Sequence, residues 1–206
     1  MYLLADSGAT KTDWIVYEQT GEVERFRTSG MNSMVQSADA IRSGAMEELK
    51  AALSGRKIHE VHFYGAGLRT KDKQAVILAM LKDVLPGAKI FVEHDLLGAA
   101  RATCGHDPGI ACILGTGSNS GWYDGKKVIA ELGGNGYLFG DEGCGADLGK
   151  TLLKMALDSE LNESIVRMIA EHAGKSLLEI RNDAYRHPRP NNFFAEWARF
   201  IKSNVE

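Results

Sequence analysis

The stretch YLLADSGATKTDWIVY, residues 2–17, decides the fold of this chain. An apolar run at residues 2–5 leads into Asp6 and a short segment rich in glycine and hydroxyl groups. A second apolar run, residues 14–17, follows directly, and two such runs joined by a glycine turn predict a β-hairpin. The tip of this hairpin gathers backbone N–H groups, hydroxyls and a lysine, a set that suits a polyphosphate.

The candidate phosphate ligands at the tip are Ser7, Gly8, Thr10, Lys11 and Thr12. Asp6 lies beside them, and a carboxylate is the side chain that holds a hydrated Mg²⁺. The tip therefore predicts ATP chemistry, with ATP and Mg²⁺ as cofactors. The alternatives are that Asp6 only caps the turn and that Lys11 is only a solvated turn residue.

Composition narrows the class of protein further. The chain has 206 residues, of which 44% are hydrophobic, enough for one large or two small domains. The net charge of −3 and the lack of a basic patch disfavour nucleic acid as a partner. No apolar run reaches the roughly 20 residues needed to cross a membrane, and no basic segment of a signal peptide precedes residue 2. Three cysteines without metal-type spacing favour a cytoplasmic location.

The rest of the first half reads as alternating strands and helices. Strands are expected at residues 2–6, 12–18, 22–28, 58–65 and 88–94, and helices at 37–54, 70–85 and 96–104. The order β-β-β-α-β-α-β-α predicts an α/β fold in which a mixed sheet carries helices on its faces.

A second hairpin then starts the pattern again. Residues 110–114 form a buried-type strand, a glycine and hydroxyl turn follows, and strands are expected at 120–123 and 127–132. Thr10 aligns with Ser118 at the same offset that aligns Trp14 with Trp122. This repetition predicts two lobes facing a cleft, at residues 1–107 and 108–206.

The end of the chain is expected to be helical, at residues 145–158, 162–173, 175–185 and 192–204. The last of these helices carries an apolar stripe formed by Phe193, Phe194, Trp197, Phe200 and Ile201. The stripe indicates a partner chain, such as the second copy in a homodimer, or else packing within the second lobe.

Four blocks in order resemble the sugar-kinase/Hsp70/actin superfamily, and within it the N-acetylglucosamine kinase branch, which is grouped with the activator ATPases of benzoyl-CoA reductase and 2-hydroxyacyl-CoA dehydratase. The blocks are residues 5–12, 93–98, 114–119 and 133–143. The resemblance implies two ribonuclease-H-like lobes of the actin and hexokinase type. The family's adenosine-binding motif is not found in these 206 residues, so a chain truncated at its C-terminus, with an incomplete second lobe, is expected.

The resemblance also implies roles for single residues. Thr10 and Thr116 would contact ATP, with Gly117 completing a second phosphate clamp. Asp95 follows a strand and would be the catalytic base, although an aspartate there could also cap the helix that follows. The implied sugar-binding residues are Asn32, Asp95, Ser118, Asn119, Gly134, Asn135, Gly136 and Asp141.

Two of these positions have further readings. The segment 140–143 is expected to open a helix, so Asp141 could be an ordinary acidic helix start. Kinases that resemble the animal enzyme carry Trp at the position of Asn135. Asn135 would offer hydrogen bonds in place of ring stacking, and this would favour a more polar sugar.

The leading interpretation is ATP-dependent phosphorylation of an amino sugar, N-acetylglucosamine, to its 6-phosphate. A non-catalytic sugar or nucleotide sensor is the first alternative. The second is an activator ATPase of a CoA-ester reductase or dehydratase, which requires an iron–sulfur cluster held by paired cysteines; here Cys144 has no suitable partner in the sequence.

Overall fold

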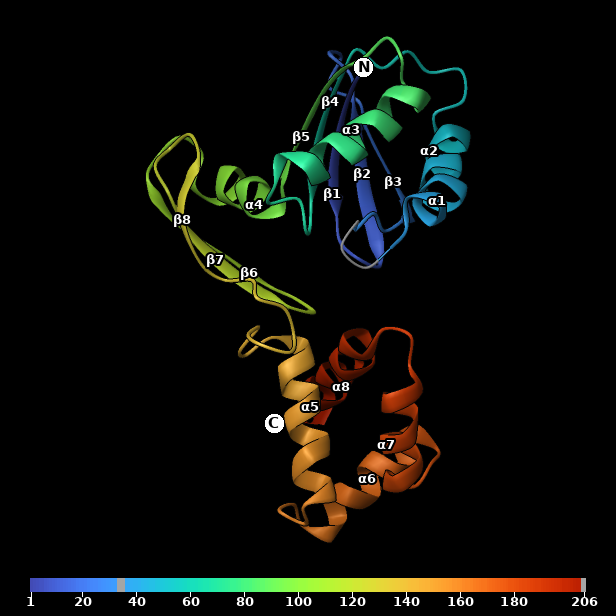
Figure 1. Ribbon diagram of the computed structural model, residues 1–206, viewed down its shortest axis with the longest axis vertical. Coiled ribbons are helices and arrows are strands. Elements are labelled where there is room, and N and C mark those ends of the chain that lie inside the picture. The colour runs from blue at the N-terminus through green and yellow to red at the C-terminus, as the bar shows by residue number, and fades with distance from the viewer. Residues whose placement is uncertain (33–35, 205–206) are drawn as a thin grey trace. The chain divides into compact units, whose positions relative to one another are not determined.

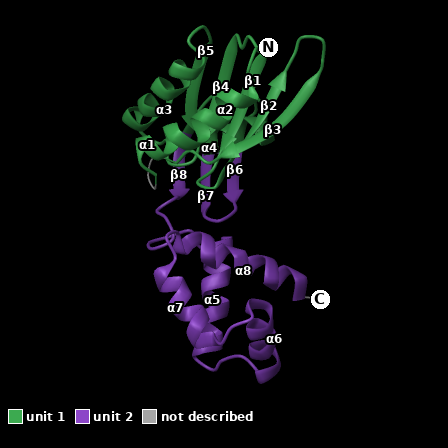
Figure 2. Ribbon diagram, turned by 90° about the vertical axis from the view of Figure 1, so that its right-hand side faces the viewer, with its two compact units in different colours: residues 1–109, 123–128 green, residues 110–122, 129–206 purple. Residues whose placement is uncertain are grey.

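The computed structural model describes residues 1–32 and 36–204, and the chain forms two compact units (Figure 2). Unit 1 contains residues 1–109 and 123–128, and unit 2 contains residues 110–122 and 129–206. The elements of the first 104 residues are β1 (Tyr2–Ser7), β2 (Lys11–Tyr17), β3 (Val23–Ser29), α1 (Ala38–Ile41), η1 (Arg42–Met46), α2 (Glu47–Ala52), β4 (Glu60–Gly65), α3 (Lys71–Val84), β5 (Lys89–His94) and α4 (Asp95–Cys104).

Unit 1 is built on a five-stranded mixed sheet with the order β3-β2-β1-β4-β5 (Figure 1). The first three strands form an antiparallel meander, whereas β4 and β5 are parallel to β1. The predicted order β-β-β-α-β-α-β-α and the mixed sheet are therefore confirmed. Because β1, β4 and β5 are parallel, their carboxyl ends lie at one edge of the sheet, where such folds place their ligands.

The helix expected at residues 37–54 is interrupted by a π-helical turn. Ser37 caps α1, and η1 then widens the helix over Arg42–Met46 before α2 continues it. The wider turn buries both Ala45 and Met46, adjacent residues that a regular helix would turn 100° apart. Periodicity alone does not reveal such a turn.

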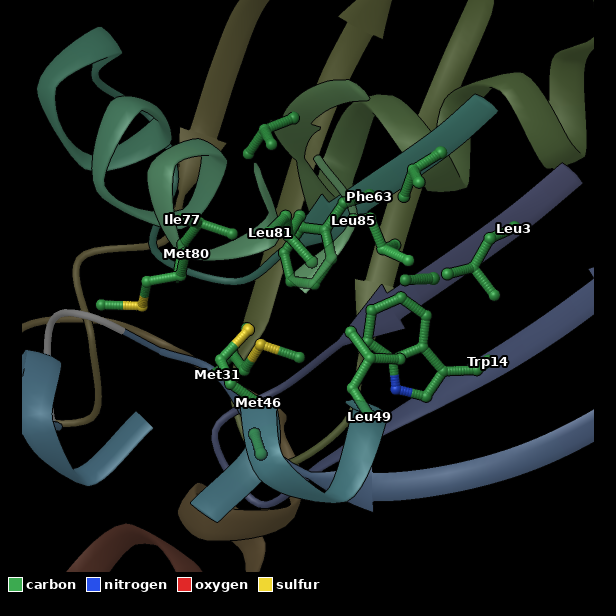
Figure 3. Close-up of a cluster of buried hydrophobic side chains, with 14 of the residues drawn as sticks. Leu3, Trp14, Met31, Met46, Leu49, Phe63, Ile77, Met80, Leu81 and Leu85 are labelled. Atoms are coloured by element: carbon green, nitrogen blue, oxygen red, sulfur yellow. The ribbon is translucent and has the colours of Figure 1, made fainter. Parts of the chain in front are cut away.

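The core of unit 1 lies between the sheet and the helices α1 to α3 (Figure 3). Trp14 is at its centre, stacked on Phe26 at a ring distance of 6.0 Å and tilted against Phe63 at 5.9 Å. Its indole Nε1 donates a hydrogen bond to the hydroxyl of Thr28, so its one polar group is satisfied in the core.

The opposite face of the sheet carries α4. A methyl group added to Gly98 on this helix would lie 2.7 Å from the Tyr64 ring, so the helix backbone packs directly on that ring. Asp6 is in register with Tyr64 on the neighbouring strand and points to the same face. The start of α4 and Asp6 therefore share one side of the sheet.

A second, three-stranded sheet has the order β6-β7-β8. Its strands are β6 (Gly109–Leu114), β7 (Ser118–Tyr123) and β8 (Val128–Gly133). The order of neighbours follows the chain, as expected for the predicted second meander.

Unit 2 ends in four helices: α5 (Gly145–Leu157), α6 (Glu163–Ala173), α7 (Leu177–Arg186) and α8 (Pro190–Asn204). Trp197 and Phe200 of α8 are buried in a cluster that includes Leu153 and Ile169. The stripe on the last helix thus packs, at these two residues, within unit 2. No helix in the described residues combines the length and apolar character needed to span a bilayer.

Candidate active site

The tip of the first hairpin is closed by a hydrogen bond from the Gly8 N–H to the carbonyl oxygen of Lys11, 2.9 Å long. Thr10 is exposed on the tip. Lys11 is also exposed, and its ammonium group lies 2.6 Å from a carboxylate oxygen of Asp13. Thr10, Lys11 and the Gly8 backbone are therefore grouped on one open turn, where a polyphosphate could approach.

Two of the predicted phosphate ligands have buried side chains. The hydroxyls of Ser7 and Thr12 lie 2.8 Å apart, and both residues are almost fully buried. The Ser7 hydroxyl also accepts a hydrogen bond from the Met31 N–H, and the Thr12 hydroxyl donates to the Ser29 carbonyl. These side chains fasten the two ends of the turn, and both residues are paired with neighbouring strands on either side.

Gly30 supports the tip from behind, and sequence reasoning missed this role. A methyl group at Gly30 would lie 2.5 Å from the carbonyl oxygen of Gly8 and 2.6 Å from the backbone of Ala9. Only glycine allows this approach of two backbone segments. Gly30 lies two residues after the third predicted strand, and a glycine at that place could have pointed to a close backbone contact. The sequence does not show that the contact is with Gly8 and Ala9.

Asp6 and Asp95 lie close enough to interact electrostatically. The pKa of Asp6 is raised, first by burial and then by the negative charges of Asp95 and Asp13, while Lys11 acts in the opposite direction. Asp95 is the first residue of α4 and follows His94, which is aligned through Gly65 with Ser7 at the sheet edge. Two carboxylates thus gather at the carboxyl edge of the parallel strands.

The cap of α4 is His94, and not Asp95, which the alternative prediction placed there. The Leu96 N–H lies 2.9 Å from His94 Nδ1 and 2.8 Å from Asp95 Oδ1. His94 and Asp95 themselves are 2.8 Å apart between the same two atoms. The helix begins at Asp95, one residue earlier than a cap at Asp95 would allow.

These carboxylates suit a Mg²⁺ ion that keeps most of its water. Mg²⁺ typically binds one or two carboxylates together with substrate phosphates. The pKa of Asp6 is raised by burial and then by the nearby Asp95 carboxylate, so a cation here would relieve repulsion. Within residues 1–32 and 36–204 no group of three or more His, Cys, Asp or Glu side chains forms a metal cage. The fit is therefore to a hydrated ion.

Asn32 follows β3 in unit 1. Its backbone N–H donates to the side-chain oxygen of Gln36, and its carbonyl accepts from the Gln36 N–H. This reciprocal pair fixes the backbone at Asn32.

In unit 2 the second glycine turn is tied to the start of α5. The Gly145 N–H donates to the Gly115 carbonyl, and the Ala146 N–H donates to that of Thr116. Cys144, the cap of α5, donates its thiol hydrogen to the same Thr116 oxygen at 2.9 Å. These bonds hold the turn at the amino end of a helix, a position that favours anions.

Asp141 lies against this turn. A methyl group at Gly117 would be 2.7 Å from Asp141 Oδ2, and the Ser118 hydroxyl donates to the Glu142 carbonyl. The structure therefore brings Gly117, Ser118 and Asp141 together. The reading of residues 140–143 as a helix start is wrong, since α5 begins at Gly145 and Asp141 has a left-handed backbone with φ of 64°.

The remaining predicted sugar ligands line the loop after β8. Gly134 lies against the amide of Asn119, which itself accepts from the Ser120 N–H. Asn135 packs its Cβ near Gly140, and the Gly136 carbonyl accepts from the Phe139 and Gly140 N–H groups. The loop is thus internally bonded, with Asn119 and Gly134 as neighbours.

One curated protein resembles part of this chain, whereas no family model matches the sequence. A stretch of 91 residues, 44% of this chain, is 36% identical to the N-acetylmuramic acid/N-acetylglucosamine kinase of Clostridium acetobutylicum. That stretch covers only 29% of the length of the curated relative.

Solved structures match over nearly the whole chain. A Porphyromonas gingivalis protein, provisionally assigned as N-acetylglucosamine kinase, is 39% identical with a TM-score of 0.86, and the match covers 98% of this chain and 72% of that one. A Chromobacterium violaceum protein with the same provisional assignment matches with a TM-score of 0.74 at 22% identity, covering 98% and 73%. MreB5 of Spiroplasma citri, solved with ADP bound, matches in fold alone, with a TM-score of 0.53 at 10% identity over 78% of this chain and 57% of its own.

Taken with the two glycine turns, these matches define the class: the chain is an actin-fold sugar kinase relative. Within that class it belongs to the N-acetylglucosamine kinase-like family.

Proposed function

We propose that this protein transfers the γ-phosphate of ATP to the 6-hydroxyl of N-acetylglucosamine. The observation that carries the proposal is the pair Asp6 and Asp95 beside an open glycine turn at the carboxyl edge of the sheet. Membership of the N-acetylglucosamine kinase-like family supports the substrate class. The curated relative is named for two amino sugars, so N-acetylmuramic acid is the natural second substrate to test.

Asp95 supplies the base that the reaction needs. A sugar hydroxyl is a poor nucleophile at neutral pH, and a carboxylate within hydrogen-bond reach can orient it and accept its proton. The 6-oxygen then forms a bond to the γ-phosphorus, the bond from that phosphorus to the β–γ bridging oxygen breaks, and ADP leaves. The proton of the hydroxyl passes to the Asp95 carboxylate.

The phosphate contacts come from the two glycine turns in this proposal. Thr10 and Lys11 would bind one part of the triphosphate, on the turn that the Gly8 N–H closes, and Thr116 with Gly117 another. Ser7 and Thr12 would support this turn from within the sheet, because their hydroxyls are buried and bonded to each other. Asp6 would hold Mg²⁺ through water, and the ion would neutralise charge on the phosphates.

The sugar contacts are proposed for side chains that can both donate and accept or that accept strongly, and for the backbone groups of two glycines. Asn32 and Asp95 would serve this role in unit 1, and the candidates in unit 2 are Ser118, Asn119, Gly134, Asn135, Gly136 and Asp141. Amides and hydroxyls match sugar hydroxyls because each group offers both a donor and an acceptor. The Asp141 carboxylate, held against Gly117, would accept from a sugar hydroxyl.

The test is ADP release from Mg-ATP with a panel of sugars, headed by N-acetylglucosamine, N-acetylmuramic acid and glucose. We expect release to depend on N-acetylglucosamine and to fall about 10²–10⁴-fold in Asp95→Asn, the usual cost of losing a general base. Identifying the product as the 6-phosphate by NMR fixes the attacked hydroxyl.

Asp72→Asn is the matched control, since Asp72 also lies in the first turn of a helix but is exposed on α3. It should leave turnover unchanged. Undiminished turnover in Asp95→Asn would remove Asp95 from the mechanism. Sugar binding without any turnover would contradict kinase activity of this chain.

A further inference from the structure

We infer that Asp13, held in place by Arg27, is a positioning residue that keeps the Lys11 ammonium group beside Asp6, where it meets the phosphates of the nucleotide. The inference deepens the proposed kinase function and rests on it. Two hydrogen bonds carry it. Lys11 Nζ donates to Asp13 Oδ2 at 2.6 Å, and Arg27 Nε donates to Asp13 Oδ1 at 2.7 Å. Each oxygen of the carboxylate therefore has a cationic partner of its own.

The pairing of the strands brings these side chains to one face of the sheet. Asp13 on β2 is the cross-strand partner of Arg27 on β3 and of Asp6 on β1. Directly paired residues share a face, and so do Lys11 and Asp13, which lie two residues apart on one strand. Burial raises the pKa of Asp6, and the positive charge of Lys11 counteracts the rise, as an ammonium group on the same face does.

An ammonium group held in this way can still bind phosphate. It carries three hydrogens, so one bond to Asp13 leaves two for phosphate oxygens. Lys11 and Asp13 alone would cancel in charge, whereas the addition of Arg27 leaves this group of side chains with a net positive charge. Arg27 thus fixes the carboxylate and also preserves the attraction for an anion.

Holding Lys11 in advance matters because its side chain is long and 53% exposed. An exposed lysine samples many rotamers, and a ligand that binds it must offset the entropy lost when the side chain is ordered. A lysine that is already ordered in the free protein removes part of that loss. The expected benefit of Asp13 is therefore in the affinity for nucleotide.

Two competing explanations predict different results. If Asp13 acts only as a negative charge near the phosphates, its removal strengthens nucleotide binding, because like charges repel. If Asp13 only stabilises the hairpin, its removal has the same effect whether or not Lys11 is present. Positioning predicts instead a loss of affinity that depends on Lys11.

The experiment is a double-mutant cycle on the dissociation constant of the non-hydrolysable ATP analogue AMPPNP with Mg²⁺, measured by calorimetry. The proteins are the wild type, Asp13→Asn, Lys11→Met and the double variant. We expect Asp13→Asn to weaken binding by about 2- to 10-fold, the cost of ordering one long side chain, and not to weaken it in the Lys11→Met background. Unchanged or stronger binding in Asp13→Asn, or equal weakening in both backgrounds, would overturn the inference.

Arg27→Gln tests the second contact, and Arg25→Gln is its matched control. Arg25 lies two residues away on the same strand and face, in register with Ile15 rather than with Asp13. Arg27→Gln should weaken binding by about 2- to 10-fold, whereas Arg25→Gln should change it by less than about two-fold in 0.15 M salt, where distant charges are screened. Equal losses in the two variants would show that only the overall charge matters, against the inference.

A second measurement is independent of affinity. ¹H–¹⁵N spectra of lysine ammonium groups report how restricted each group is, and the Lys11 signal is the one that vanishes in Lys11→Met. We expect a restricted Lys11 in the nucleotide-free wild type and a mobile one in Asp13→Asn, and equal mobility would refute the positioning role. Coupling between Asp13 and Lys11 in a protein without sugar-dependent turnover would refute the kinase function alone. Turnover without coupling would refute the inference alone.

Discussion

Asp6 is the residue at which function and stability are opposed. Its pKa is raised by burial, by Asp95 and by Asp13, so the folded protein binds a proton at Asp6 more tightly than the unfolded chain does. The ionised carboxylate therefore costs folding free energy as pH rises above 3.8, the ordinary pKa of an aspartate, and through the raised pKa. A cation bound beside it would offset that cost.

We predict that Asp6→Asn raises the melting temperature at pH 7 by a few degrees, because it removes an ionised group from a site that disfavours charge. The gain should shrink as pH falls toward 3.8, where the wild-type carboxyl also becomes neutral. Thermal melts of both proteins between pH 3.5 and 7.5, a range of roughly four pH units around these values, measure the difference. Mg²⁺-dependent nucleotide binding should weaken in the same variant.

Asp13 offers a matched control on the same hairpin. Its pKa is lowered, first by the hydrogen bond from Lys11 and also by that from Arg27, so its ionised form stabilises the fold above pH 3.8. Asp13→Asn should lower stability at pH 7, by about 0.2–1 kcal/mol for an exposed pair. A melting temperature that falls in both variants would show that Asp6 is not under repulsion.

Sequence could predict the composition of the site better than its hydrogen bonding. The hairpin tip, Asp6 and Asp95 were found because strands and glycine turns are local patterns. That Ser7 and Thr12 bond to each other, and that His94 caps α4, are contacts between residues only five and two positions apart. Their geometry depends on which rotamer each side chain adopts, and the alternation of apolar and polar residues does not encode it.

At the level of elements, the pairing of α5 with α8 depends on Gly149. A methyl group there would lie 1.8 Å from the Phe194 carbonyl oxygen and 3.0 Å from the Trp197 side chain. A backbone carbonyl cannot move away without shifting its helix. The glycine in α5 is thus required by the close approach of α8.

We predict that Gly149→Ala destabilises unit 2 by about 3 kcal/mol, at the upper end of the range for overpacking, despite the better helix propensity of alanine. Circular dichroism melts measure the effect. Gly44→Ala is the control, since an added methyl group at this helical glycine meets nothing within 4 Å and should be neutral or slightly stabilising. Equal stability of the two variants would contradict the tight packing of α5 on α8.

The sequence predicted nearly every helix and strand of the described chain to within one or two residues at each end. Alternation and helical periodicity are strong where one face is buried, as in β1, with every second residue in the core. The two differences have a common cause. The π turn at Arg42–Met46 and the left-handed Asp141 are both departures from the regular backbone that periodicity describes.

At the level of the whole molecule, the chain contains two separate apolar clusters. The cluster in unit 1 is centred on Trp14 and Phe63, and that in unit 2 on Ile169 and Trp197. Each cluster holds one buried tryptophan, which is a natural fluorescence reporter of its own unit. The third tryptophan, Trp122, is 56% exposed and changes environment little on unfolding.

We predict that each core stabilises mainly its own unit. Ile169→Ala should lower the stability reported by Trp197 by about 2–5 kcal/mol and leave that reported by Trp14 nearly unchanged. Leu49→Ala, an equally buried position in unit 1, should do the reverse. Urea titrations of Trp14→Phe and Trp197→Phe backgrounds isolate the two reporters. If either substitution shifts both transitions equally, the two cores unfold as one cooperative system, and stability cannot be assigned to separate units.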